Sequence, residues 1–153
     1  MAIGLLGSEV AAACSCARDI PFAPGFTPAP DARARWAQEQ MRLADAAVVG
    51  RLLDVRLRRG LAHSRYRIGA VYKGGRRLRR GQIVTVRSAG SPAACGLPQE
   101  VGRRHGLLLY RRRGHPRWHS GLCSLMSASD MRLGLSAKGA RAGRRDVGPP
   151  VCF

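Results

Sequence analysis

A chain of 153 residues can form one domain with its own apolar core, and none of its apolar runs approaches the roughly 18–20 residues of a membrane-spanning helix. The formal net charge of +18 favours an anionic partner. Residues 1–50 hold four arginines and five acids, whereas residues 51–153 hold 23 basic residues and four acids. Because only Lys73 and Lys138 are lysines and the other 25 basic residues are arginines, a GC-rich coding bias with a solvated surface is the competing explanation, and the one that the composition favours.

The first 13 residues, "MAIGLLGSEVAAA", are similar to the end of a secretory signal, with small residues before Cys14 as a cleavage site. They predict a secreted or cell-surface protein. Cys14 and Cys16 are one residue apart, so in an extended segment their side chains point in opposite directions and do not pair with each other. The number of cysteines is odd, so at least one has no partner within the chain: Cys14, Cys16, Cys95, Cys123 and Cys152.

The periodicity then predicts elements in chain order. Residues 17–30 hold four prolines and are expected to form a loop, and residues 31–44 read as a helix with Asp31 as its N-cap. From Ala46 the apolar period becomes two, which predicts strands over 46–59, 64–75, 82–88, 105–113 and 117–126. The alternation places one set of side chains on a common face in each of the first two strands: Leu53, Val55 and Leu57, then Tyr66, Ile68, Ala70 and Tyr72.

One helix and about five alternating strands predict an all-β fold with one or two helices. The count fits a five-stranded antiparallel Greek-key barrel such as the OB-fold. Residues 127–153 are rich in Gly, Arg and Pro without a strong period, and are expected to form a weakly ordered basic tail.

Six segments in order resemble the N-terminal domain of the tissue inhibitors of metalloproteinases, within the netrin-like module and its simple single-domain bacterial-type members. The resemblance covers residues 14–126 and implies an OB-fold barrel. It also implies the disulfides Cys14–Cys95 and Cys16–Cys123, which staple the N-terminal segment and leave Cys152 free or intermolecular. The segments are "CSC" (14–16), "ADAAVVGRLLDV" (44–55), "YRIGAVYKG" (66–74), "SAGSPAACG" (88–96), "VGRRHGLLLY" (101–110) and "LCS" (122–124).

The resemblance further implies a binding module and not an enzyme, with no cofactor. Inhibitors of that family insert their N-terminal segment into a protease active site. After cleavage, the Cys14 amine and carbonyl oxygen would chelate the protease zinc in trans. The matching wedge is Cys14, Ser15, Cys16 and Ala17, and the loop tethered to it is Ser91, Pro92, Ala93 and Ala94.

Other functions stay open. The partner is a zinc metalloprotease or another extracellular protein, and a membrane partner is expected only if Cys14 is lipidated. His115, His119 and Cys123 have a metal-like spacing, but Pro116 and Gly121 disfavour the helix that would align them, so no bound metal is expected. A single-strand nucleic-acid site is a further alternative, although the aromatic residues that such sites use are scarce. The basic residues for it are Arg56, Arg58, Arg65, Arg67 and the "RRLRR" turn (76–80).

Overall fold

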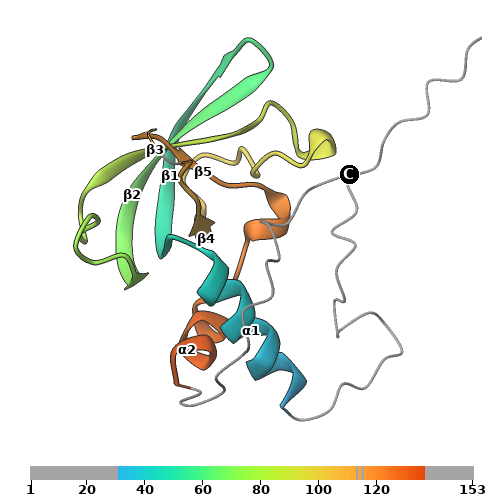
Figure 1. Ribbon diagram of the computed structural model, residues 1–153. Helices are drawn as coiled ribbons and strands as arrows, with labels where there is room; N and C mark the ends of the chain where they lie inside the picture. The colour runs from blue at the N-terminus through green and yellow to red at the C-terminus, as the bar shows by residue number, and fades with distance from the viewer. Residues whose placement is uncertain (1–30, 113, 115, 137–153) are drawn as a thin grey trace, which may run out of the picture.

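The computed structural model describes residues 31–112, 114 and 116–136. Five strands form one open mixed sheet in the order β4-β1-β2-β3-β5, and two helices lie beneath one end of it (Figure 1). The predicted mostly-β fold with helices is therefore confirmed. The elements are α1 (Ala32–Leu43), β1 (Ala46–Arg58), β2 (Leu61–Lys73), β3 (Ile83–Ala89), the 3-10 turn η1 (Pro92–Ala94), β4 (Arg104–Leu109), β5 (Trp118–His119), the 3-10 turn η2 (Leu122–Ser124) and α2 (Ala128–Ser136).

The sequence predicted an antiparallel sheet, but one of the strand pairs is parallel. β1 pairs antiparallel with β2 and β4, and β2 pairs antiparallel with β3, but β5 runs parallel to β3. The fifth strand was also predicted too long, because only Trp118 and His119 extend the sheet. At the end of this short strand, the backbone of His119 exchanges two 2.9 Å hydrogen bonds with Tyr110, which comes directly after β4.

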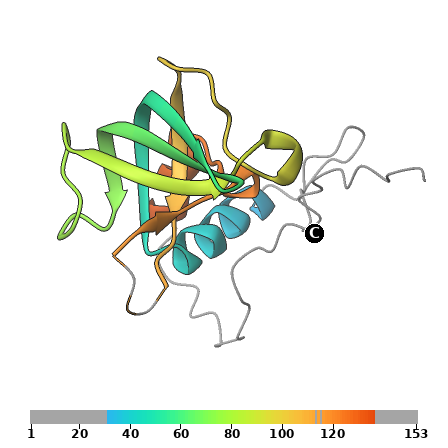
Figure 2. The same ribbon diagram turned by 90° about the horizontal axis from the view of Figure 1, so that it is seen from above.

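Two apolar clusters stabilise the fold, one on each side of the sheet. The first is enclosed by the strands and includes Leu52, Tyr66 and Leu107, each fully buried. The second lies between the sheet and the helices, where Ala37 and Met41 of α1 contact Leu108 of β4. Figure 2, seen from above, places α1 along one side of the strands. The predicted helix is therefore present, and its apolar residues pack against the sheet.

The predicted alternation fails at irregular points of the β1–β2 register. Between Leu52 and Asp54 the pairing shifts, so Leu52 is buried while Leu53 is only half-buried. Further register shifts after Ala47 and after Val49 change which face of the sheet the paired side chains of β2 point to. Tyr66 consequently packs in the enclosed cluster, whereas Tyr72 packs against the helices. A bulge inserts one unpaired residue and so moves every later side chain to the other face.

The segment predicted as a weakly ordered tail begins with a helix. α2 covers Ala128–Ser136 and packs on α1. Gly134 permits the close approach, because a Cβ at this position would lie 2.8 Å from the carbonyl oxygen of Ala37. Apolar Met131, fully buried against α1, is the signal that the sequence analysis missed. Residues 137–153 lie outside the described part of the chain.

Candidate functional site

The loop predicted to accompany the wedge is held by backbone contacts. Ser91 is the N-cap of η1, and its hydroxyl and its carbonyl oxygen both accept from the N–H of Ala94. The carbonyl oxygen of Ser91 also accepts from Gly96 at 2.8 Å, and Cys95 takes the left-handed conformation, with φ of 64°. A Cβ at Gly96 would lie 2.2 Å from the carbonyl oxygen of Ala89, so only glycine fits this tight turn.

Further contacts fix the loop on the sheet. Buried Ser88 accepts the N–H of Leu97 on its hydroxyl, and the side chain of Leu97 is fully buried in the enclosed core. Gln99 donates its side-chain amide to the carbonyl oxygen of Gly90 at 2.7 Å. The loop between these contacts is exposed over four residues, so it presents a defined surface to solvent: Ser91, Pro92, Ala93 and Ala94.

The second predicted anchor, Cys123, lies beside the first. Cys123 is in η2 and not in a strand as the sequence predicted. The N–H of Leu122 donates to the carbonyl oxygen of Cys95 at 2.9 Å, and a Cβ at Gly121 would lie 3.0 Å from the same oxygen. The structure therefore brings together the turns that carry Cys95 and Cys123, which are far apart in the sequence.

Both of these cysteines are disulfide-bonded. The wedge residues Cys14, Ser15, Cys16 and Ala17 lie outside the described residues, as does Cys152. The pairings Cys14–Cys95 and Cys16–Cys123 therefore remain predictions.

The "YKG" motif has a structural role. Lys73 ends β2 and directs its ammonium group at the carboxyl end of α1, where it donates to the carbonyl oxygens of Met41 at 2.7 Å, Arg42 at 3.1 Å and Ala44. Carbonyls at a helix end lack intrahelical partners, and a cation satisfies them. Gly74 follows with a φ of 91°, and a Cβ there would lie 2.7 Å from that of Ala46. The motif thus joins the first helix to the sheet.

The metal-like spacing is not brought onto one helix. His119 is in β5, Cys123 is disulfide-bonded in η2, and His115 lies outside the described residues. Within the described ranges, no three His, Cys, Asp or Glu side chains gather as a metal site. Neither described helix has the length and apolar composition of a membrane span.

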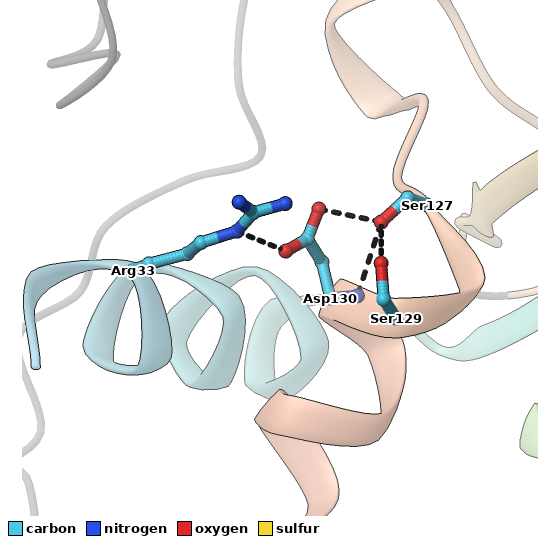
Figure 3. Close-up of polar contacts among 4 residues, drawn as sticks. All are labelled: Arg33, Ser127, Ser129 and Asp130. Atoms are coloured by element: carbon cyan, nitrogen blue, oxygen red, sulfur yellow. Dashed lines mark hydrogen bonds and ion pairs between the residues drawn. The ribbon is translucent and has the colours of Figure 1, made fainter.

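A polar cluster joins the two helices (Figure 3). Asp130 of α2 accepts from the Nε of Arg33 at 2.6 Å and from the hydroxyl of Ser127 at 2.6 Å, while its own N–H donates to the oxygen of Ser127 at 3.1 Å. Burial raises the pKa of Asp130, but the hydrogen bonds from Arg33 and Ser127 and the charge of Arg33 outweigh it and lower the pKa below its usual value. The cluster is a helix cap and an interhelix ion pair.

Of the basic residues predicted for a nucleic-acid site, those at 56, 58, 65 and 67 lie on the sheet, and the 76–80 turn connects β2 to β3. Arg56 and Arg67 are exposed, and Arg65 forms an ion pair with Asp54 at 2.8 Å. The tyrosines that could stack on bases are elsewhere, because Tyr66 is fully buried and Tyr72 packs against the helices. The basic surface is therefore present without a tyrosine platform.

No protein-family model matches this chain, and a search of curated proteins finds no match either. The resemblance to the metalloproteinase inhibitors rests on the motifs quoted above.

Proposed function

We propose that this protein is a secreted or cell-surface binding module of the netrin-like class, related to the metalloproteinase inhibitors, and that it acts by binding and not by catalysis. The observation that carries the proposal is the hydrogen bond between Leu122 and Cys95. It places two bonded cysteines on neighbouring turns. The N-terminal segment 14–16, whose two cysteine side chains point in opposite directions, could form one disulfide with each of these two cysteines.

The dimensions support this arrangement. Two residues of extended chain span about 6.6 Å, and the Cα atoms of a disulfide lie about 5.5 Å apart. Cys14 and Cys16 can therefore reach two adjacent turns from one extended segment without folding back. The exposed Ser91–Ala94 loop would then flank the segment and widen the surface that meets a partner.

The strand arrangement supports an OB-fold barrel as the frame. In the sheet order β4-β1-β2-β3-β5, the parallel β3–β5 pair returns the chain towards β4. The two hydrogen bonds between Tyr110 and His119 lie where such a barrel would close. We propose that this contact closes the barrel.

The proposed mechanism uses the amine that cleavage after Ala13 would create. An α-amino group has a pKa near 8, so a useful fraction is unprotonated at neutral pH. The Cys14 nitrogen and carbonyl oxygen would close a five-membered chelate on a protease zinc and displace its water. Ser15 would point towards the substrate pocket beside the metal. Two bridges would hold this wedge rigid and so reduce the ordering cost of association.

The decisive experiment compares protein that starts at Cys14 with protein that carries one added alanine before it. The added residue converts the amine into an amide, which no longer chelates. Against a panel of zinc endopeptidases, only the first protein should inhibit. Equal inhibition by both would disprove chelation, and inhibition by neither would favour a netrin-like interaction module with a different partner.

Peptide mapping without reduction tests the proposed disulfide pairing independently of any inhibition assay. The proposal expects peptides that link residues 14 and 16 to residues 95 and 123. A Cys95–Cys123 bridge would leave the N-terminal segment untethered, and the wedge would have to be abandoned.

A further inference from the structure

The outer face of the sheet, opposite the enclosed core, is divided into two parts. One part is covered by the helices, which pack on Ala47, Val49 and Leu108. The other part meets neither described helix and carries mainly arginines. Exposed Arg51 and Arg67 alternate with buried Leu52, Tyr66 and Ile68, which shows that the arginines point away from the core.

The strand register aligns these arginines into rows, because directly paired residues of antiparallel strands project to the same face. Arg51 of β1 is paired with Arg67 of β2 on one side and with Arg104 of β4 on the other. Three rows run across the strands. The first row is Arg104, Arg51, Arg67 and Ile83, the second is Asp54, Arg65 and Thr85, and the third is Arg56, His63 and Arg87.

We name these ten positions the arginine face. It holds six arginines and a single acid, Asp54, which is ion-paired to Arg65. In the described part of the chain no ion pair joins Arg51, Arg67 or Arg104 to an acid. Like charges directly opposite each other destabilise a sheet. A row of three facing arginines therefore costs stability unless a ligand supplies negative charge.

The pKa of His63 is affected by the positive charge of this face. Burial lowers its pKa, and the charges of Arg87, Arg58 and Arg117 lower it further. The neighbouring groups come from each adjoining element: Arg56 and Arg58 from β1, Arg87 from β3, and Arg117 from the segment before β5.

The composition of the arginine face limits the classes of ligand that it can bind. It contains no Phe, Tyr or Trp, so the bases of a single-stranded nucleic acid would have no stacking platform. Ile83, 42% exposed, is its one large apolar side chain, which is too little to insert into a bilayer. Guanidinium groups recognise carboxylates and sulfates through paired hydrogen bonds. Strands about 4.8 Å apart repeat this recognition at short, regular intervals.

We propose that the arginine face binds a linear acidic polysaccharide that carries sulfate or carboxylate groups on successive sugars. The proposal uses none of the residues of the proposed inhibitory wedge, so either proposal can fail without the other.

The test measures binding of the mature protein to heparin, a sulfated polysaccharide, at several salt concentrations. The variant Arg51→Gln/Arg67→Gln/Arg104→Gln should bind at least about tenfold more weakly at physiological salt, with a shallower salt dependence. The control Arg42→Gln/Arg112→Gln/Arg132→Gln removes the same charge from exposed positions on α1, after β4 and on α2, and should change binding less than about threefold.

Equal weakening of both triple variants would show that only net charge matters and would overturn the proposal. Tighter binding of a single-stranded DNA of matched charge, or of phosphatidylglycerol vesicles, with loss in the same arginine variant, would assign the face to nucleic acid or to membrane instead.

A single reversal distinguishes binding from folding. Arg67→Glu places an acid opposite Arg51 and should maintain or raise the Tm while it weakens heparin binding. A lowered Tm with unchanged heparin binding would contradict the proposal. The His63 ring provides a second readout by NMR, because bound polyanion should raise its pKa, and an unchanged pKa at saturating heparin would contradict contact with the third row.

Discussion

Leu122 donates its backbone N–H to the carbonyl oxygen of Cys95 at 2.9 Å, and this contact joins two turns from distant parts of the chain. Glycines at this contact allow the backbones of the two turns to approach closely. Gly96 approaches the carbonyl oxygens of Ala89 and Ser91, and Gly121 approaches that of Cys95. The position of both cysteines thus depends on backbone packing at these glycines.

Substitution of Gly96 by alanine should therefore disrupt this junction. The added Cβ would lie 2.2 Å from one backbone oxygen and 2.6 Å from another, which neither can relieve by rotating a side chain. We expect a loss of about 3 kcal/mol in the free energy of unfolding, measured by urea denaturation. Gly75→Ala is the matched control, since a Cβ there meets nothing within 4 Å, and it should change stability by less than about 0.5 kcal/mol. Similar losses in both variants would contradict the packing argument.

Lys73→Met should loosen α1 from the sheet. The change keeps the length of the side chain but removes the ammonium donor from the carbonyls of Met41, Arg42 and Ala44. The expected loss is about 1–3 kcal/mol, with faster amide exchange in the last turn of α1. Arg77→Met, at an exposed position of the following turn, serves as the control. Unchanged exchange in α1 would show that Lys73 does not cap the helix.

Asp130 should make stability depend on acidic pH. Its pKa is lowered in the fold, so its contribution is fully present above the unfolded value near 4 and is lost as pH falls through the lower folded value. The difference in unfolding free energy between the wild type and Asp130→Asn should stay constant from about pH 5 to 8 and shrink below about pH 4. Chemical denaturation across this range measures it. A difference that does not shrink in acid would mean that the carboxylate is not stabilised by Arg33 and Ser127.

Tyr66 should affect stability at alkaline pH. Its hydroxyl is buried without a hydrogen-bond partner in the described part of the chain, and burial raises its pKa to about 12. A raised pKa of an acidic group favours the neutral form in the fold, so stability is intact below about pH 10 and falls as pH rises towards 12.

Tyr66→Phe removes the unpartnered hydroxyl and keeps the ring in the core. At neutral pH it should be as stable as the wild type or more stable by about 1 kcal/mol. Above pH 10 its advantage should grow, because phenylalanine does not titrate. An advantage that disappears at alkaline pH would indicate that the hydroxyl has a partner that stabilises the phenolate.

The sequence by itself determined the local elements. A run of good helix formers after Asp31 predicted α1, and apolar residues at a period of two predicted the four long strands, because these patterns depend on near neighbours in the chain. Bulges were not predicted, since a shift such as that between Leu52 and Asp54 satisfies the pairing of the whole sheet and leaves no local signal. The same limit explains the reversed face of Tyr72. Helix α2 is a different case, because apolar Met131 was a local signal for it that the prediction did not use.

Only the tertiary structure decided which distant residues meet. Cys95 and Cys123 belong to separate sequence motifs. The hydrogen bond from Leu122 to Cys95 forms only because the two turns pack together. Alternating arginines were visible in each strand, but register alone places Arg51 between Arg67 and Arg104. Strand register is fixed by burying the apolar face, with Leu52, Tyr66 and Leu107 inside. The arginines of the outer face are aligned as a consequence of that burial.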